Sequence, residues 1–403
     1  MKIPFSPPDI SEQEIAEVTE ALRSGWITTG PRTKQLEKNI AQYVGVNRCV
    51  CLNSQTACAE MALHLLGVGP GDEVIVPAYT YTASASVVCH VGAKPVLIDC
   101  QKDSLEMDYD AVAAAINENT KAIIPVDLAG IPCDYEKLFA IAESKRHLFK
   151  PTSQIQQALG RVAIMADTAH AFGAKLGDKM IGSVADFSSF SFHAVKNLTT
   201  AEGGALTWCS IAGIDDEDIY KQLQLFSLHG QSKDALAKTQ LGAWEYDIVG
   251  TWYKCNMTDV VAAIGLKQLE RYPGMLERRR QIIEKFDAAF RPLGIKTLEH
   301  YTEEYQSSGH LYLTRIPGIT AQQRNDIIIK MAEAEIACNV HYKPLPMHTA
   351  YKNLGFDIAD YPNAYAHFAN EITLPLHTNL TDEQVDYIIE QYSRIVKEYI
   401  ADV

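Results

Sequence analysis

The sequence predicts an α/β protein with a mostly parallel, seven-stranded sheet between helices and a smaller α+β domain at the C-terminus. Short apolar runs alternate with helical patterns over the first half of the chain, which is typical of βαβ units. The length of 403 residues suggests two or three domains at roughly 150 residues per domain. Hydrophobic residues make up 47% and charged residues 21%, a composition that excludes a disordered or fibrous chain.

Two helices are expected before the sheet begins. Ser11-x-x-Glu14 is a capping box, and apolar residues follow it at helical spacing, so the first helix should end near Gly25. The segment from Trp26 to Pro31 is then a loop, and a second helix is expected from about Arg32 to Tyr43.

The sheet is expected from seven short apolar runs, which have the length of buried strands. These runs are Arg48–Leu52, Glu73–Pro77, Pro95–Asp99, Ala122–Asp127, Val162–Asp167, Phe187–Phe192 and Gly204–Trp208. Helical patterns fill connections between them at Thr56–Leu66, Ala83–Val91, Tyr109–Ile116 and Tyr135–Ser144. The stretch Lys145–Arg161 is polar and irregular, and we interpret its middle as a surface insertion.

A second domain is expected after residue 260. A long helical pattern starts at Thr258, and Pro273-Gly274 should break or kink that helix. The later elements expected are a strand at Leu311–Ile316, a helix at Ala321–Ala334, a strand at Ile336–His341 and a last amphipathic helix that opens at Thr381-x-x-Gln384. We therefore expect a large domain over residues 1–260 and a small α+β domain over residues 261–403.

The charge, the N-terminal residues and the cysteines exclude several classes of protein. The 36 basic and 50 acidic side chains give a net charge of −14, which argues against a nucleic-acid partner. No apolar run approaches the roughly 18 residues of a membrane helix, and no apolar signal segment follows Met1. The nine cysteines include no C-x-x-C pair and mostly lie in apolar strings such as Val87-Val88-Cys89. We expect buried thiols in the cytoplasm, without disulfides or a metal site.

Two turns next to the helix Thr56–Leu66 have different meanings. Gly67-Val68-Gly69-Pro70-Gly71 follows the helix and precedes a strand, so it predicts a helix stop rather than a nucleotide loop. The turn from Asn53 to Ala57 leads from a strand into the helix, where free N–H groups and the helix dipole favour a phosphate. Plain N-capping by Ser54 or Thr56 explains the same residues, so both interpretations stay open.

Two charged side chains follow predicted core strands. Asp167, in Ala166-Asp167-Thr168-Ala169-His170, ends a buried strand at the edge where ligands of open α/β sheets bind, although it could also cap the next helix. Lys196 follows a Ser-rich strand in a stretch of low charge. Such surroundings lower the pKa of an amine and make it nucleophilic, whereas a lone lysine is usually solvated.

The order of these features resembles that of the fold-type I pyridoxal-phosphate enzymes. A phosphate-cradling turn is followed by the aromatic loop Tyr79-Thr80-Tyr81, a strand-end aspartate and Ser-x-x-x-x-Lys. More narrowly, nearly the whole chain resembles the DegT/DnrJ/EryC1/StrS family of nucleotide-sugar aminotransferases. The segments that carry this resemblance are Ser24–Gly30, Asp167–His170, Ser191–Asn197, Glu202–Gly204, Asn256–Asp259 and His341-Tyr342.

The resemblance implies pyridoxal 5′-phosphate as the cofactor, with pyridoxamine 5′-phosphate as its intermediate form. Lys196 matches the lysine that forms the internal aldimine, and Asp167 matches the carboxylate that pairs with the pyridinium nitrogen and so maintains the electron sink. Tyr81 matches the aromatic residue that stacks on the ring. His170 is expected near the phenolic oxygen of the ring.

The resemblance also implies a phosphate site and a homodimer with shared active sites. Thr56 and Ala57 match the backbone amides that hold the phosphate, together with the Ser191 hydroxyl. Asn256 matches a residue that reaches the phosphate from the neighbouring subunit.

The reaction implied is a transamination in two half-reactions, with ping-pong kinetics. L-Glutamate donates the amino group, Lys196 acts as general acid and base, and a keto-sugar nucleotide accepts the group. We expect amination at C4 of a 4-keto-6-deoxy hexose. Trp26, Thr29, His341, Tyr342 and Lys343 are candidate substrate contacts, although a buried strand end explains the last three almost as well.

Two departures from the family and three rival functions limit the prediction. The Lys145–Arg161 stretch is longer than the usual connection. Phe226-Ser227-Leu228-His229-Gly230 lacks the basic residue that many relatives carry before His-Gly, so contacts to the donor carboxylate and the diphosphate stay unassigned. The dehydratase branch has histidine in place of the lysine, and Lys196 argues against it because His193 lies three residues away. The other rivals are a non-catalytic cofactor-binding dimer and a nicotinamide-dependent oxidoreductase, which would need a Gly-rich strand–helix turn.

Overall fold

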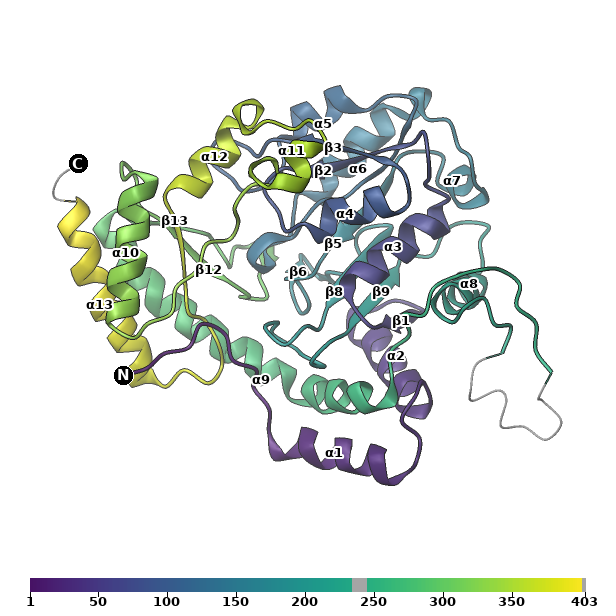
Figure 1. Cartoon of the computed structure of the whole chain (residues 1–403), viewed down its shortest axis with the longest axis horizontal. Helices are drawn as coiled ribbons and strands as arrows, with labels where there is room; N and C mark the ends of the chain where they lie inside the picture. The colour runs from purple at the N-terminus through teal and green to yellow at the C-terminus, as the bar shows by residue number, and fades with distance from the viewer. Residues whose placement is uncertain (234–244, 401–403) are drawn as a thin grey trace.

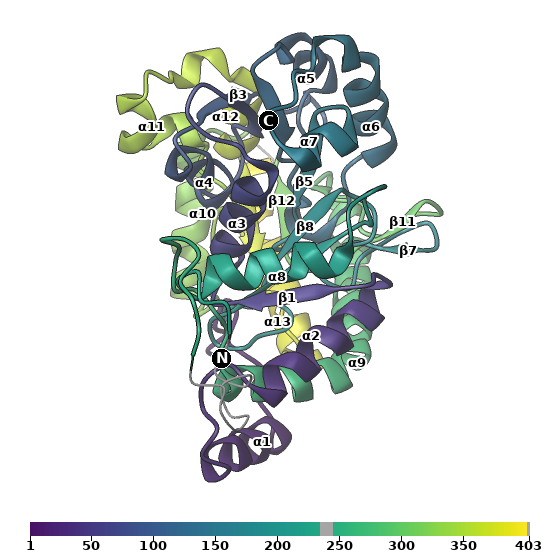
Figure 2. The ribbon, with the colours of Figure 1, turned by 90° about the vertical axis from the view of Figure 1, so that its right-hand side faces the viewer.

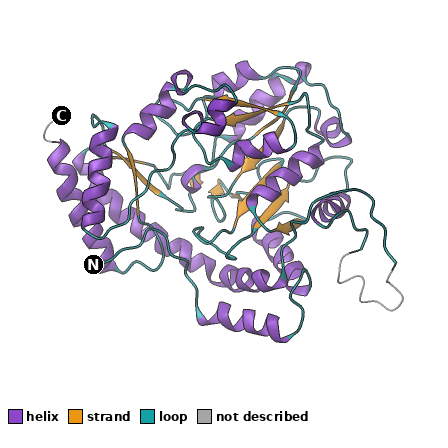
Figure 3. Cartoon of the chain, viewed as in Figure 1, coloured by secondary structure: helices purple, strands orange, loops and turns teal. Residues whose placement is uncertain are grey.

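The fold consists of a large part around one sheet and a smaller C-terminal part, with the long helix α9 (Asp259–Phe290) running through both (Figure 1). The structure is a computed structural model, and it describes residues 1–233 and 245–400. Figure 3 shows the strands of the large sheet lying between helices. No helix among these residues is long and apolar enough to cross a membrane.

The large sheet has seven strands in the order β1-β9-β8-β5-β4-β2-β3. Their bounds are β1 (Cys49–Leu52), β2 (Glu73–Pro77), β3 (Lys94–Ile98), β4 (Thr120–Ile123), β5 (Ala163–Asp167), β8 (Phe187–Ser191) and β9 (Gly204–Trp208). Strand β9 is antiparallel to both neighbours, and the other pairs are parallel. The predicted α/β class and the mostly parallel seven-stranded sheet are confirmed.

Alternating side chains of the central strands support separate cores on the two faces of the sheet. In β2, Val74 and Val76 pack with Leu63, whereas Ile75 packs with Leu138. Burial on both faces explains why these strands are continuous apolar runs in the sequence. The helices of this part are α1 (Glu12–Arg23), α2 (Pro31–Val44), α3 (Gln55–Leu66), α4 (Ala83–His90), α5 (Tyr109–Ala115), α6 (Tyr135–Ser144), α7 (Gln154–Leu159) and α8 (Asp216–Ser227).

Helices α2 and α8 lie on either side of β1, and α9 lies beyond α2 (Figure 2). The sequence analysis does not predict α8. The capping box of α1 is confirmed. The Ser11 side chain accepts from the Glu14 backbone N–H, and the Glu14 side chain accepts from the Ser11 backbone N–H. Gly67 ends α3 in the left-handed conformation, at a φ of 77°, which confirms the predicted helix stop.

The Lys145–Arg161 stretch is only partly a surface insertion. It forms the 3₁₀ turn Arg146–Leu148 and helix α7, and Ile155 and Gln156 of α7 are buried. The Gln156 Nε2 and the Ser153 hydroxyl both donate to the carbonyl oxygen of Leu66, at 2.8 and 2.7 Å. The insertion therefore satisfies the C-terminal end of α3, a contact that its own composition does not indicate.

The smaller part has an antiparallel sheet in the order β10-β12-β13, covered by helices. Its elements are β10 (Lys296–Thr297), β12 (Tyr312–Arg315), α10 (Ala321–Glu333), α11 (Thr349–Asn353), α12 (Pro362–Ala369), β13 (Glu371–Leu374) and α13 (Asp382–Ile400). A third sheet, in the order β11-β6-β7, joins β11 (Tyr305–Gln306) to β6 (Lys175–Leu176) and β7 (Lys179–Met180).

One strand predicted for this part is absent, and of the break or kink expected at Pro273 the break does not occur. The segment Ile336–His341 is not a strand: Ile336 makes an isolated bridge to Ile3 and Asn339 one to Thr373, and β13 takes the place in the sheet. Helix α9 does not end at Pro273, because the buried side chains Tyr272 and Met275 hold it on both sides of the proline. The tertiary contacts there offset the one backbone hydrogen bond that a proline removes.

The division into domains at residues 260 and 261 remains a proposal, since two segments cross it. Ile3 packs in the core of the smaller part with Phe286, whereas Tyr351 and Tyr361 pack in the core of the larger part. All nine cysteines are free, and six of them are buried. Cys89 is exposed, contrary to the expectation from its apolar string, because it lies near the end of α4.

Candidate active site

A cavity of about 390 Å³ lies at the carboxyl ends of the central strands. This is the edge at which open α/β sheets bind ligands. The predicted site residues that line it are Thr56, Tyr81, Asp167, His170, Ser191, Lys196, His341 and Tyr342. The structure thus brings together residues from α3, the ends of β2, β5 and β8, and the smaller part.

Asp167 is the last residue of β5 and is 5% exposed. The Ser84 hydroxyl donates to its Oδ2 at 2.7 Å, and the Ala169 N–H donates to its Oδ1 at 3.1 Å. Burial raises the pKa of Asp167, and these two hydrogen bonds together with the Lys196 charge oppose the rise. Ser84 is a site residue that the sequence analysis missed, because it lies inside a predicted helix and carries no motif.

Lys196 lies in the short segment after β8, where its N–H donates to the His193 carbonyl at 2.9 Å. Burial lowers the pKa of its amine to about 8, and the negative charge of Asp167 acts in the opposite direction. The amine and the carboxylate thus face the same desolvated space. This setting is that of a nucleophilic amine rather than of a solvated surface lysine.

The N-terminus of α3 forms the anion-binding side of the cavity. Ser54 caps the helix by accepting from the Ala57 N–H at 3.1 Å, so that amide is already used, while Thr56 faces the cavity. A Cβ on Gly204 would lie 2.5 Å from the Gln55 nitrogen, so only glycine lets β9 approach this helix end. The N-cap by Ser54 is confirmed. The phosphate site stays a prediction, which the position of this helix end at the cavity favours.

A histidine and two tyrosines form the opposite wall. The Ala129 N–H donates to His170 Nδ1 at 3.2 Å, so the ring proton of neutral His170 lies on Nε2, which donates to the Tyr342 hydroxyl at 3.1 Å. Burial and the Lys196 charge hold the pKa of His170 well below its usual value. Tyr81 is 61% exposed, with its ring 6.0 Å from that of Tyr342.

Hydrogen bonds to side chains of β13 hold the backbone and the ring of His341. Its N–H donates to Glu371 at 2.8 Å, and its Nδ1 lies 2.9 Å from the Thr373 hydroxyl. Burial lowers the pKa of His341 to about 3 and raises that of Glu371 to about 8. Glu371 and Thr373 belong to β13, a strand absent from the sequence prediction, so no sequence signal placed them here.

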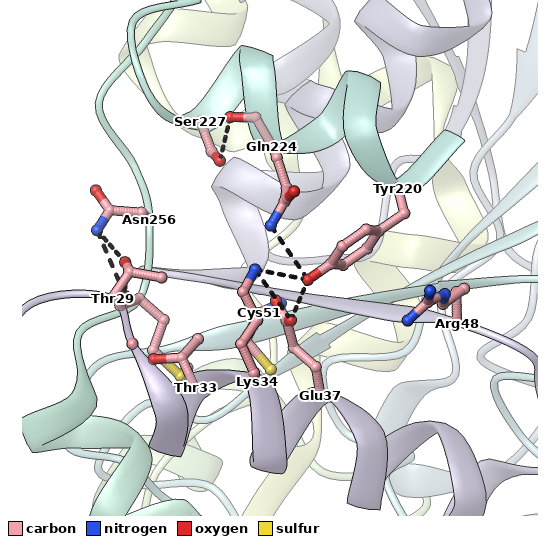
Figure 4. Close-up of polar contacts among 12 residues, drawn as sticks. Thr29, Thr33, Lys34, Glu37, Arg48, Cys51, Tyr220, Gln224, Ser227 and Asn256 are labelled. Atoms are coloured by element: carbon pink, nitrogen blue, oxygen red, sulfur yellow. Dashed lines mark hydrogen bonds and ion pairs between the residues drawn. The ribbon is translucent and has the colours of Figure 1, made fainter. Parts of the chain in front are cut away.

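Five predicted residues are not among those that line this cavity: Trp26, Thr29, Ala57, Asn256 and Lys343. The Asn256 Nδ2 donates to the Thr29 hydroxyl at 2.5 Å, and that hydroxyl donates to the Met257 carbonyl at 2.5 Å (Figure 4). Trp26 donates from Nε1 to the Thr29 carbonyl at 3.2 Å, and its ring lies where a Cβ of Gly30 would be. Figure 4 also shows the Tyr220 hydroxyl donating to Glu37, which joins α8 to α2.

The polar groups of the cavity fit pyridoxal phosphate. The helix N-terminus and the Ser191 hydroxyl suit a phosphate, the Asp167 carboxylate suits a ring nitrogen, and the Lys196 amine suits an aldehyde carbon. The polar lining residues that are not among the predicted site residues are Ser54, Gln55, Thr80, His193 and Glu202. Among residues 1–233 and 245–400, no group of three or more His, Cys, Asp or Glu side chains is placed to hold a metal ion.

The chain is similar to known proteins over nearly its whole length. A family model described as the DegT/DnrJ/EryC1/StrS aminotransferase family matches residues 8–393. The spore coat polysaccharide biosynthesis protein SpsC of Bacillus subtilis is 36% identical over 402 residues, which cover 98% of this chain and 97% of that protein.

Solved structures of aminotransferases are also similar to this chain in fold and sequence. The PMP form of the putative sugar aminotransferase Spr1654 from Streptococcus pneumoniae is 59% identical, with a TM-score of 0.96 over 98% of this chain and 100% of that chain. A PLP form of the same protein has a TM-score of 0.95 over 99% of both chains and is 57% identical. Helicobacter pylori PseC, an aminotransferase involved in the biosynthesis of pseudoaminic acid, is 26% identical, with a TM-score of 0.86 over 99% of this chain and 100% of that chain.

The match to the family model spans nearly the whole chain, and the overlaid structures share its fold. The predicted fold-type I architecture, the transaminase class and the pyridoxal-phosphate cofactor are confirmed. The chain belongs to the DegT/DnrJ/EryC1/StrS family and is a pyridoxal-phosphate-dependent aminotransferase.

Proposed function

We propose that this enzyme moves an amino group from L-glutamate to a keto-sugar nucleotide, at C4 of a 4-keto-6-deoxy hexose, by a ping-pong mechanism. The observation that carries the proposal is the pairing of a half-buried lysine, Lys196, with a buried carboxylate, Asp167, in one cavity beside a helix N-terminus. The surroundings of each cavity side chain support a separate role in this reaction.

Asp167 orients and polarises the cofactor ring. Bound pyridoxal phosphate supplies an electron sink that makes the α-proton of an attached amino acid acidic. The Asp167 carboxylate, held by Ser84 and the Ala169 N–H, holds a proton at the ring nitrogen. The α3 N-terminus, with Thr56 and the Ser191 hydroxyl, binds the phosphate group.

Lys196 moves the proton. Its amine takes the proton from Cα of the donor and delivers it to the C4′ carbon, and it runs the transfer in reverse with the acceptor. With a pKa of about 8, half of these amines are neutral at pH 8, whereas an ordinary lysine is neutral in only about 1 molecule in 300. Neutral His170 donates its one ring proton to Tyr342, which leaves the Tyr342 hydroxyl as an uncharged hydrogen-bond donor in the cavity.

The sugar acceptor is supported by the names of the relatives. They are a spore coat polysaccharide biosynthesis protein, a putative sugar aminotransferase and an aminotransferase of pseudoaminic acid biosynthesis. His341 and Tyr342 line the cavity and are the best-placed contacts for such an acceptor. The nine free cysteines support a cytoplasmic enzyme.

A homodimer with shared active sites is part of the proposal. Asn256 and Thr29 lie outside the cavity of their own chain, so they contact a phosphate or a substrate only if a second chain docks there. An apolar groove of about 370 Å³ runs beside the Lys196 segment, between Ala194 and Ile15 of α1. Exposed Ile10 lines this groove, and exposed Val195 follows its lining residue Ala194, so such a partner would bury both.

The direct test combines the purified enzyme, pyridoxal phosphate, L-glutamate and a panel of UDP-, dTDP- and GDP-linked keto sugars. Mass spectrometry should detect an amino sugar from one 4-keto substrate, and glutamate alone should bleach the visible absorbance of the bound cofactor. Bleaching without any amino sugar would contradict the sugar assignment. No bleaching with glutamate would contradict the assigned donor.

The shared site has its own test. Asn256→Ala should release pyridoxal phosphate faster during dialysis, because the partner's phosphate loses a hydrogen-bond donor, and Asn353→Ala in α11 serves as the control. Unchanged retention, or a monomer in sedimentation, would contradict the shared site.

A further inference from the structure

A loop from the smaller part, residues 307–310, crosses behind the cavity and is held from three sides. The Ser308 N–H donates to the Gly130 carbonyl at 3.1 Å, and the His310 N–H donates to the Ala129 carbonyl at 3.0 Å. From α9, the buried Arg279 Nη1 donates to the Gly309 carbonyl at 3.1 Å and to the His310 carbonyl at 3.3 Å. The 307–310 loop is therefore a fixed element.

This loop determines the orientation of the Asn197 amide, one residue after Lys196. The Asn197 Nδ2 donates to the Ser308 carbonyl at 2.8 Å, and a carbonyl can only accept. The other end, Oδ1, therefore faces His310 Nδ1, at 2.8 Å. Because Oδ1 can only accept, His310 must carry its proton on Nδ1.

The His310 ring also packs on His170 in the cavity wall. The two ring centroids lie 4.3 Å apart at an interplanar angle of 42°. The Ser308 hydroxyl donates to the His170 carbonyl at 2.5 Å, so the same loop holds both the ring and the main chain of His170. Burial and the nearby His170 and Lys196 hold the pKa of His310 well below its usual value, which keeps the ring neutral.

The loop that contains Ala129 and Gly130 packs closely against the 307–310 loop. Gly130 has a φ of 90°, and a Cβ there would lie 2.1 Å from the Ser308 hydroxyl oxygen. Glycine is thus required both by the backbone conformation and by the close approach of the 307–310 loop. The contact between the two parts of the molecule is built at this point, directly beneath the residues that line the cavity.

We propose that His310 is a positioning residue for Lys196: its Nδ1–H fixes the Asn197 amide, and its ring supports His170, so that one side chain sets the backbone under the reacting amine and the wall opposite it. The inference rests on the proposed use of Lys196 as the proton carrier. Without the Nδ1 donor, the buried Asn197 Oδ1 loses its partner, and the segment 196–197 gains freedom. Misplacement by about 1 Å at a reacting group costs up to about 10²-fold in rate.

The test compares two substitutions at position 310 in the holoenzyme. His310→Phe keeps the ring but removes the donor, whereas His310→Asn places an amide N–H where Nδ1–H was. With L-glutamate, the half-reaction of His310→Phe should be about 10-fold or more slower at saturation, with less than about a 3-fold change in KM. The visible circular dichroism of the bound cofactor should decrease. His310→Asn should recover most of both signals.

His367→Phe is the matched control, since His367 is equally buried and donates to the Gln101 carbonyl outside this network. It should keep the wild-type rate and circular dichroism. Wild-type values in His310→Phe would overturn the proposal, and so would equal losses in the Phe and Asn variants that follow their melting temperatures.

If His310→Phe does not fold, Asn197→Leu supplies the second measurement. It removes the acceptor of the His310 Nδ1–H at about constant size, and it should give the same loss of rate with little change in KM. The circular dichroism needs no glutamate, so failure of the assigned donor is distinguishable from failure of this inference.

Discussion

Asp167 and Asp259 are both buried carboxylates at the ends of secondary-structure elements, but their hydrogen bonding differs. Asp259 Oδ1 accepts from the Gly30 N–H at 2.8 Å and from the N–H and hydroxyl of Thr33 at 2.9 and 2.8 Å, and its Oδ2 accepts from the Arg32 N–H at 3.0 Å. Asp167 accepts one hydrogen bond on each oxygen. A carboxylate has about four acceptor sites.

The difference separates a structural carboxylate from a chemical one. Asp259 uses its acceptor capacity on the N-terminus of α2, where the helix dipole also favours a negative charge. Asp167 keeps unused acceptor capacity beside Lys196, and burial leaves its pKa raised. A buried carboxylate with spare acceptors that faces a cavity is therefore the better candidate for binding a ligand.

The largest expected effect tests the chemical side of this comparison. Lys196→Ala should reduce the glutamate half-reaction by about 10⁴-fold or more, because no other lysine of the described residues lines the cavity. The far-ultraviolet circular dichroism should stay that of the folded protein. Lys285→Ala, at an exposed ion pair with Asp386, is the control. Activity near the control value would contradict the assignment of Lys196.

Asp167→Asn should lower the half-reaction rate by about 10² to 10³-fold, since a neutral amide no longer stabilises a protonated ring nitrogen. Burial raises the pKa of Asp167 in the folded protein, so at neutral pH its ionisation favours the unfolded chain. The melting temperature of the apo variant should therefore be unchanged or higher. A clear decrease in the melting temperature would show that Asp167, like Asp259, mainly stabilises the fold.

The pH dependence of cofactor capture sharpens the same comparison. Only a neutral amine attacks an aldehyde, so the rate at which apo enzyme binds pyridoxal phosphate should rise with pH and level off above about 8, the pKa of Lys196. Stopped-flow absorbance measures this rate. An ordinary lysine would give a rate that still rises towards about pH 10.4.

Asp259→Asn should have the smallest effect on the chemistry and act on stability instead. The amide offers one oxygen to four donors and directs its NH₂ group at an N–H, which costs about 2 to 3 kcal/mol in the free energy of unfolding. Urea denaturation measures the loss. If the variant keeps its stability but loses the glutamate half-reaction, the distinction between the two carboxylates fails.

The residues that the sequence placed in the cavity are those next to strand ends. Asp167 and Ser191 end core strands, and Lys196 follows Ser191 by five positions, so the predicted strand ends locate all three at the sheet edge. Burial on both faces makes most strands of the large sheet short apolar runs, which is why they could be predicted, although β8 is rich in serine.

The missed residues depend on contacts that no local pattern records. Ser84 lies 83 positions from Asp167, and His310 lies 113 positions from Asn197. Glu371 starts β13, a four-residue strand whose first side chain is a buried carboxylic acid, so its sequence does not resemble a strand. In each case, tertiary packing rather than periodicity determines the position.

Helix α9 sets the distance between the Gly30 loop, which Asp259 holds, and the 307–310 loop, which Arg279 holds. Asp259 begins the helix and holds the Gly30 loop, and Arg279 on the same helix holds the loop that carries His310. Twenty residues of continuous helix separate them, a spacing of about 30 Å in which each residue adds about 100° of rotation. Adding or deleting one residue in this interval would turn Arg279 away from its carbonyls. We expect the interval to accept substitutions on its exposed face but no change of length.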